Sequence, residues 1–261
     1  MTTSPPEATD APMTLPRLFH GTTVARLQFI LEKGILPSSQ IGNRHYAHMR
    51  PTTDFVYLCS YRAFKYSDYA SVNDQLKFDP IGLVWPASVV LVEIDTSELD
   101  LANLRPDEDL YTRLVGELPK CPDGSQIGID WAEENPELWR TSLDVYGSVA
   151  HKGAIPVACI RKVGLLFLRP TCLVSSVIRK FNTFKDPAHW QELKFKHEAI
   201  TRAIMGEGIA PEEILSEEEI ANKGTDRDTL SAWLESATVT TYERDDQGKW
   251  TPRLFGDHSP M

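Results

Sequence analysis

The chain is poor in cysteine, and its cysteines form no recognisable site. None of the four makes a Cys-x-x-Cys pair, so the spacing indicates neither a zinc site nor a redox motif. They lie at positions 59, 121, 159 and 172, mostly among apolar residues. Buried free thiols in a reducing compartment are the simplest interpretation, and we therefore expect a cytoplasmic protein.

The sequence also lacks a long hydrophobic run. Its longest apolar stretches, 87–92 and 163–168, are far shorter than the roughly 20 residues that span a membrane. Residues 1–14 are rich in Pro, Thr and Ser and contain no apolar segment of a secretory signal, so we expect a disordered leader. No membrane partner is expected.

Basic residues are in the minority. The 261 residues include 37 Asp and Glu against 27 Lys and Arg, which gives a formal net charge of -10. This balance disfavours a general affinity for the nucleic-acid backbone, although a local basic patch remains compatible with it. The length allows one large domain, or one domain with a smaller appendage.

Hydrophobic periodicity predicts an α+β fold. A helix over 24–33 is expected to begin at a threonine cap and to stop at Gly34. Further expected elements are a strand over 55–59, a helix over 62–71, a strand over 87–94, apolar segments over 145–150 and 157–168 with a turn at 151–153, and a helix over 187–205. We expect a main domain over 15–168 and a mostly helical extension over 169–261, with an acidic helix over 211–221 and a polar tail from Val239.

The segment His20-Gly21-Thr22 is the first candidate binding element, placed between a strand and the helix over 24–33. A glycine lets the backbone approach a ligand closely, and an imidazole can hydrogen-bond a ribose hydroxyl. The beginning of a helix also favours anionic groups. A simple turn and helix cap is the alternative reading of the same three residues.

Two tyrosines form the second candidate element. Tyr57 lies on an expected strand and Tyr66 on the helix that follows it. Two aromatic side chains on neighbouring elements can form a slot for a flat cationic ring such as nicotinamide. Ordinary packing of both tyrosines is the competing interpretation.

Taken in order, these segments resemble the ADP-ribosyltransferase superfamily, which includes the PARP-type and DarT-type enzymes. The segments that carry the resemblance are Leu18-Phe19-His20-Gly21-Thr22, Gly34-Ile35-Leu36-Pro37, Phe55-Val56-Tyr57-Leu58, Val89–Asp95 and Gly153-Ala154-Ile155-Pro156 with Ile160. The resemblance covers residues 15 to 168 and implies split antiparallel β-sheets with flanking helices. It also implies NAD as the co-substrate.

The resemblance implies a role for each matching residue. His20 would hold the adenosine ribose, the backbone of Gly21 would hold the nicotinamide amide beside Thr22, and Tyr57 would stack on the ring. Tyr66 or Tyr69 would form the opposite wall. In the loop over 38–54, Arg44 and Arg50, with His45 and His48, would suit the pyrophosphate of NAD or an anionic acceptor. A solvated loop without a binding role is the alternative.

The family's third motif is where this sequence departs from the pattern. The equivalent strand, expected over 144–150, contains no glutamate, and Ser148 or Tyr146 falls nearest its position. Asp144 and His151 flank the segment as possible acid or base. The acid could therefore be Asp144 or a glutamate of the 133–137 region, the enzyme could act without it, or the fold could bind a nucleotide without catalysis.

We therefore expect an enzyme that transfers ADP-ribose from NAD to an acceptor and releases nicotinamide, in a toxin, effector or phage-related role. No metal is expected, because no credible ligand cluster is present. The acceptor is not encoded in a recognisable motif: a protein or small molecule fits the acidity, and a nucleic acid is disfavoured but open. Rival hypotheses are a noncatalytic NAD- or ADP-ribose-binding module and an RNA 2'-phosphotransferase-like enzyme.

Overall fold

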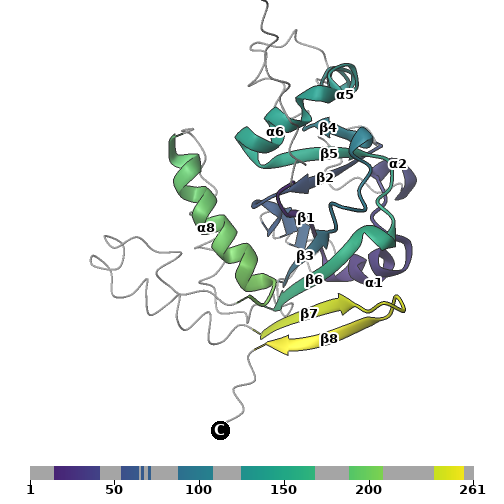
Figure 1. Cartoon of the computed structure of the whole chain (residues 1–261), viewed down its shortest axis with the longest axis vertical. Helices are drawn as coiled ribbons and strands as arrows, with labels where there is room; N and C mark the ends of the chain where they lie inside the picture. Colours follow the sequence, from purple (N-terminus) through teal and green to yellow (C-terminus); the bar gives the residue numbers. More distant parts are fainter. Residues whose placement is uncertain are drawn as a thin grey trace, which may run out of the picture.

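One antiparallel β-sheet organises the chain in the computed structural model, which describes residues 15–41, 54–64, 66–67, 70–71, 88–107, 125–167, 188–207 and 238–255. The sheet has eight strands in the order β4-β5-β2-β1-β3-β6-β7-β8 (Figure 1). The strands are β1 (Leu18–Thr22), β2 (Phe55–Cys59), β3 (Ser88–Ile94), β4 (Leu104–Pro106), β5 (Ser148–Lys152), β6 (Ile160–Phe167), β7 (Thr238–Arg244) and β8 (Trp250–Phe255).

The helices are short, apart from one near the C-terminal end of the chain. They are α1 (Val24–Lys33), α2 (Ser38–Ile41), α5 (Ser125–Glu134), α6 (Trp139–Tyr146) and α8 (Ala188–Ile204), with 3-10 turns η1 (Leu101–Asn103), η3 (Pro136–Leu138) and η4 (Val157–Cys159). The described residues of 63–71 are helical as well. The expected α+β class is thus confirmed, as are the predicted helices over 24–33 and 187–205 and the strands over 55–59 and 87–94.

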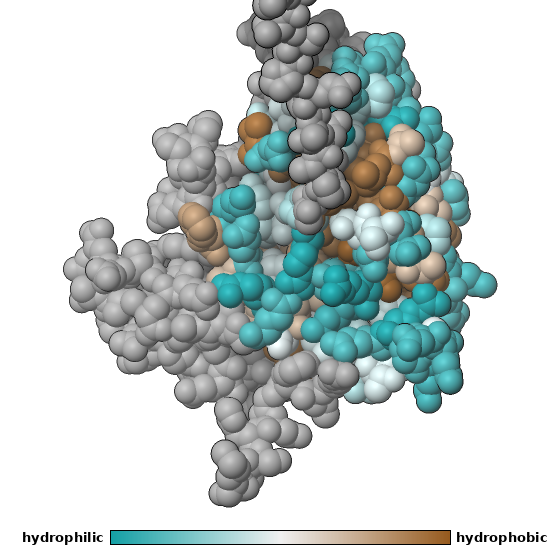
Figure 2. Space-filling model, viewed as in Figure 1, coloured by the Kyte–Doolittle hydropathy of each residue, from teal (hydrophilic) through white to brown (hydrophobic). Residues whose placement is uncertain are grey.

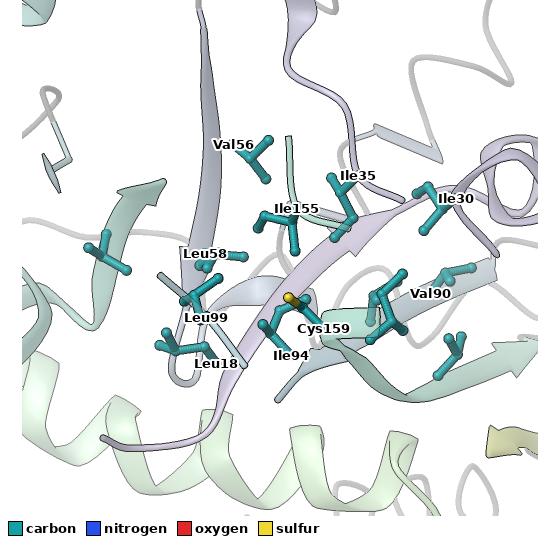
Figure 3. Close-up of a cluster of buried hydrophobic side chains, with 14 of the residues drawn as sticks. Leu18, Ile30, Ile35, Val56, Leu58, Val90, Ile94, Leu99, Ile155 and Cys159 are labelled. Atoms are coloured by element: carbon teal, nitrogen blue, oxygen red, sulfur yellow. The ribbon is translucent and has the colours of Figure 1, made fainter. Parts of the chain in front are cut away.

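Apolar side chains alternate between the two faces of the sheet, as the period of a strand requires. On one face Leu18, Val90 and Ile30 of α1 belong to one cluster of buried apolar side chains (Figure 3). On the other face Phe19 and other strand residues pack with Ile200 of α8. Helices α1 and α8 accordingly lie on opposite sides of the central strands in Figure 1. Hydrophilic residues cover much of the described surface in Figure 2, with apolar ones gathered in its upper half.

The junction between β1 and β2 is the weakest of the sheet. Strand β1 pairs with β3 in register from Leu18↔Ile94 to Thr22↔Val90, but it pairs with β2 only at Phe19↔Cys59. The expected split into separate sheets is therefore not observed as such. One sheet is present, and a single registered pair joins its two parts.

The segment over 20–22 lies inside a strand and not, as expected, in a connection between a strand and a helix. His20, Gly21 and Thr22 are the last residues of β1. Thr23 takes the cap position of α1, but its side chain makes no cap hydrogen bond. Gly34 ends α1 with a φ of 83°, which only glycine adopts without strain.

The predicted strand over 144–150 is wrong in its first half. Asp144 belongs to α6, which ends at Tyr146 and is capped by Gly147 with a φ of 64°. Strand β5 then begins at Ser148 and continues through Lys152, so the turn lies at Gly153 and not at 151–153. A left-handed glycine lets the helix stop and the strand begin within one residue.

The C-terminal part of the chain contributes two strands to the same sheet, whereas we expected a mostly helical extension with a polar tail from Val239. β7 pairs with β6, and β8 pairs with β7 along its whole length. Alternating Thr, Val and Tyr residues in β7 fit a half-buried strand better than a tail. Helix α8 is the helical part of this region that the structure describes.

Several expectations fall on residues outside the described ranges. These are the leader over 1–14, most of the loop over 38–54 and the acidic helix over 211–221. Within the described residues, no helix has the length and apolar character needed to cross a membrane.

Candidate active site

The side chain of His20 bridges the two strands where their backbones separate. Its Nδ1 lies 3.0 Å from the carbonyl oxygen of Tyr57. Because a carbonyl oxygen only accepts hydrogen bonds, Nδ1 must carry the proton. Burial lowers the pKa of His20, and the nearby charge of Arg26 lowers it further against the effect of the hydrogen bond. The imidazole is therefore neutral at pH 7, and its Nε2 presents a lone pair.

The backbone of Gly21 faces the gap between β1 and β2. In an antiparallel sheet the N–H and C=O of one residue point to the same neighbouring strand, and the direction alternates along the chain. The Tyr57 carbonyl points toward β1, and Cys59 pairs with Phe19, so Phe19 and Gly21 point toward β2. The registered pairing ends at Phe19, and Gly21 has no registered counterpart on β2. Its amide and carbonyl are therefore placed to bind a group inserted between the strands.

Gly21 is also required for packing against the helix over 63–71. A Cβ at Gly21 would lie 2.0 Å from the carbonyl oxygen of Ala63 and 2.8 Å from the backbone nitrogen of Ser67. The Ser67 hydroxyl donates to the Thr22 carbonyl at 2.6 Å and accepts from the Val90 amide at 2.7 Å. The close backbone approach that the sequence predicted for a ligand is thus made, on this face, by a helix of the same chain.

The side chains of Tyr57 and His20 extend from opposite faces of the sheet. Tyr57 is half-buried beside Phe55, Ala150 and Trp131. His20 directly follows Phe19, which shares a face with Cys59 and therefore with the Tyr57 side chain. The two residues meet through the Tyr57 carbonyl and not through their rings.

Tyr66 belongs to the helix that covers Gly21, on the same side of the sheet as the Tyr57 ring, and its side chain is 42% exposed. The two tyrosines of the expected nicotinamide slot therefore lie on the same side of the sheet. Arg44, Arg50 and Tyr69, which we predicted as further cofactor-binding residues, lie outside the described residues.

The buried carboxylate of Asp107 lies beside β5, the strand that itself contains no glutamate. Ser148, the residue nearest the expected glutamate, donates a hydrogen bond from Oγ to Oδ2 of Asp107 at 2.5 Å. Both side chains are buried. Asp107 follows β4 directly, and β4 pairs with β5 at Pro106↔Val149, so Asp107 comes to lie beside Ser148. A length of 2.5 Å is typical of a hydroxyl that donates to an ionised carboxylate.

The side chain of Ser142 links the backbones of this pair. The Ser142 hydroxyl accepts from the Asp107 amide at 3.0 Å and donates to the Ser148 carbonyl at 2.7 Å. The Cys59 thiol lies 3.7 Å from the Ser148 hydroxyl, where it is a weak donor. Burial is the main reason why the pKa of Cys59 is raised to about 12, so this thiol is not a nucleophile at neutral pH.

Asp107 is not among the acids expected from the sequence, which all lie between positions 133 and 151. Asp107 lies in the acidic, proline-containing stretch over 100–140, 41 positions before Ser148. Only the pairing of β4 with β5 brings the two together. The Pro-Asp sequence at the end of the short strand β4 is the one local signal that could have drawn attention to it.

The other two candidate acids lie away from Ser148. Asp144 is exposed on α6. His151 is buried on the opposite face of β5, paired with Val56 and Leu104 in register, and its Nδ1 lies 3.3 Å from the Gly153 carbonyl. Desolvation lowers the pKa of His151, although its hydrogen bond to Gly153 acts in the other direction. This is the environment of a neutral core histidine.

Of the glutamates in the 133–137 region, Glu133 is engaged in ion pairs. Glu133 binds Nε of Arg105 at 3.3 Å and Nζ of Lys152 at 2.8 Å. Two cations keep this carboxylate occupied over β4 and β5, which makes it a poorer candidate acid than Asp107. Across the part of the chain that the structure describes, no group of three potential metal ligands occurs.

Comparison with known proteins adds no family assignment. No protein-family model and no curated protein matches this chain.

Proposed function

We propose that this protein is an NAD-dependent ADP-ribosyltransferase, which transfers ADP-ribose from NAD to an acceptor and releases nicotinamide. The observation that carries the proposal is the separation of β1 from β2 beyond Phe19↔Cys59, with the backbone of Gly21 facing the gap. An unpaired strand edge offers one donor and one acceptor side by side. A primary carboxamide, such as that of nicotinamide, needs this complementary pair of groups.

His20 provides the second element of the proposed site. Its Nδ1 is held by the Tyr57 carbonyl, so its Nε2 is fixed as a hydrogen-bond acceptor. A ribose hydroxyl is a suitable donor for this atom, and a neutral imidazole adds no positive charge beside a cationic nicotinamide. The rigid strand positions of His20 and Gly21 would orient the substrate without loop closure.

Tyr57 and Tyr66 supply the aromatic surface that the proposal requires. Both residues lie on the side of the sheet that also carries the buried pair of Asp107 and Ser148. An aromatic face stabilises a cationic ring, and nicotinamide then leaves as a neutral molecule. The protein has to hold the substrate, exclude water and stabilise the positive charge that develops on the ribose.

Release of nicotinamide from NAD tests the proposal. The wild-type protein should release nicotinamide in the presence of a suitable acceptor or, more slowly, of water, and His20→Ala should reduce this rate by about 100-fold. Arg244→Ala, a change on the exposed end of β7, serves as the matched control and should retain the wild-type rate. No release under any acceptor condition, including cell extract and 2'-phosphorylated RNA, would exclude an NAD-consuming enzyme.

A noncatalytic NAD-binding module is the second candidate, favoured by the absence of a glutamate on β5. The two functions differ in one result. Binding of NAD that is lost in His20→Ala, without any nicotinamide release by the wild type, would select the module over the enzyme.

A further inference from the structure

The pair of Asp107 and Ser148 lies close to the proposed nicotinamide site by the register of the sheet. Cys59 of β2 is paired with Phe19 on one side and with Ser148 on the other. The gap between β1 and β2 opens directly beyond this row. Tyr57 is paired with Ala150, so Ser148 is its diagonal neighbour on the same face. The Cα atoms of such diagonal neighbours are about 7–8 Å apart, a distance that a ribose ring can bridge.

Ser148 is oriented to accept a hydrogen bond from a ligand. Its own proton is given to Oδ2 of Asp107 at 2.5 Å, which leaves the Oγ lone pairs to accept. One of them receives the Cys59 thiol at 3.7 Å, a weak contact. A ribose hydroxyl is a stronger donor than a thiol and could replace it at little cost.

We propose that Ser148, polarised by Asp107, takes the place of the missing glutamate: its Oγ accepts a hydroxyl of the nicotinamide ribose, and the Asp107 carboxylate acts through it as a positioning residue. This inference rests on the proposed function. It assigns the negative charge of the site to Asp107, directly after β4, whereas the family resemblance places the acid on the neighbouring strand.

The chemistry requires no proton transfer to this pair. The bond between ribose C1′ and the nicotinamide nitrogen breaks, and its electron pair remains on nitrogen, which neutralises the ring. A lone pair of the acceptor forms the new bond to C1′, and the acceptor proton passes to solvent. While positive charge develops on the ribose, the hydrogen bond from its hydroxyl to Ser148 strengthens, because the carboxylate behind Ser148 is buried and negative.

Substitutions that separate charge from packing test the assignment. Asp107→Asn keeps the shape of the side chain and removes its charge, whereas Asp107→Glu keeps the charge. We expect Asp107→Asn and Ser148→Ala each to lower kcat for nicotinamide release by about 100-fold, with the KM for NAD changed by less than about threefold. Because the two residues act as a unit, the double variant should lose little more than either single variant.

Two control variants accompany these changes. Ser60→Ala removes a nearby hydroxyl that lies 3.5 Å from the Gly147 carbonyl, and Asp246→Asn removes an exposed carboxylate in the turn between β7 and β8. Both should retain the wild-type kcat. A loss of kcat in Asp107→Asn but not in Asp107→Glu supports the role of the charge, whereas an equal loss in both shows that the network is structural only and overturns the assignment.

Further comparisons keep the test decisive if Asp107→Asn fails to fold. Ser148→Thr keeps a hydroxyl at the site, so it should retain kcat where Ser148→Ala loses it; equal rates in these two variants would overturn the proposal. An active wild type, an inactive His20→Ala and a fully active Asp107→Asn would refute the Asp107 and Ser148 assignment while leaving the transferase intact. A wild type that releases no nicotinamide would instead refute the proposed function itself.

Discussion

The imidazole of His20 donates a hydrogen bond to the backbone carbonyl of Tyr57. Its Nδ1 hydrogen-bonds the Tyr57 carbonyl at 3.0 Å, at the point where the pairing of β1 with β2 has just ended at Phe19↔Cys59. One contact thus satisfies a carbonyl at the edge of the gap and fixes the tautomer of the ring. The structural and the proposed functional roles of His20 follow from the same hydrogen bond.

Nicotinamide release should depend on pH through His20. Because burial lowers the pKa of His20 below its usual 6.5, the ring takes up a proton at a lower pH than an exposed imidazole does, and its Nε2 remains an acceptor at neutral pH. The rate should therefore be highest at pH 7.5 and fall on acidification at a lower pH than the titration of an exposed imidazole would give. A pH-rate profile measures this, with His20→Gln as the non-titrating control. A rate that increases on acidification would contradict a role for neutral His20.

Gly21 should tolerate no side chain. Its Cβ would lie 2.0 Å from the Ala63 carbonyl, so Gly21→Ala must displace the helix over 63–71 from the sheet. We expect a loss of more than about 2 kcal/mol in the free energy of unfolding, as for other overpacked core positions. Gly153→Ala is the matched control: its φ is 82°, but nothing lies within 4 Å of the added Cβ.

The control should cost about 1–2 kcal/mol, which is the penalty for a left-handed alanine alone. Urea unfolding of both variants provides the measurement. If Gly21→Ala is no less stable than Gly153→Ala, the helix does not pack on Gly21 as described.

Two buried histidines should make the fold sensitive to acid. The pKa values of His20 and His151 are both lowered by desolvation, so between these pKa values and about 6.5 the unfolded chain binds more protons than the folded chain. The stabilisation is complete above the unfolded pKa and is lost as the pH falls through the folded pKa values. Urea midpoints at pH 7.5, 6.0 and 5.0 should decrease in that order.

His151→Gln isolates one of these contributions. The variant lacks the titrating group, so its midpoint should change less with pH than that of the wild type. A pH dependence identical to that of the wild type would show that His151 is not buried in the neutral form.

Arg17 should be important for attaching the end of α8 to the sheet. Its guanidinium binds the buried carboxylate of Glu93 at 2.8 and 3.0 Å and contacts Glu207, after α8, at 2.6 Å. Arg17→Met leaves Glu93 buried without this partner, and we expect a loss of about 2 kcal/mol, less than for a fully buried pair because Arg17 is partly exposed. Lys194→Met, which removes an exposed pair with Glu198 at 3.8 Å, is the control and should cost about 0.5 kcal/mol or less. Equal thermal stability of the two variants would contradict this account.

Local patterns predicted the elements that are long and regular. The apolar positions of 24–33 and the glycine after them specify α1, and the β-branched run before Asp95 specifies β3. The hairpin of β7 and β8 was missed because its residues are mostly polar. Strand β7 is recognisable only as alternating Thr, Val and Tyr, and the turn after it only by Gly248, whose φ is 80°. Tertiary pairing with β6 decides the structure there.

The candidate site was predictable in part. The order of His20, Gly21 and Tyr57 in the sequence indicated the three residues that now lie around the gap between β1 and β2. Which atoms meet was not predictable, since the His20 ring contacts a carbonyl and not a ring. The carboxylate beside Ser148 depends on a contact between residues far apart in the sequence, and a search along β5 alone could not find Asp107.

The most direct test of the central claim is a crystal structure of the protein soaked or grown with NAD. The account predicts that the nicotinamide amide binds the N–H and C=O of Gly21 in the gap between β1 and β2, and that a ribose hydroxyl lies within hydrogen-bond distance of Nε2 of His20. NAD bound at another place, or no bound NAD at millimolar concentration together with an unchanged unfolding temperature, would contradict it.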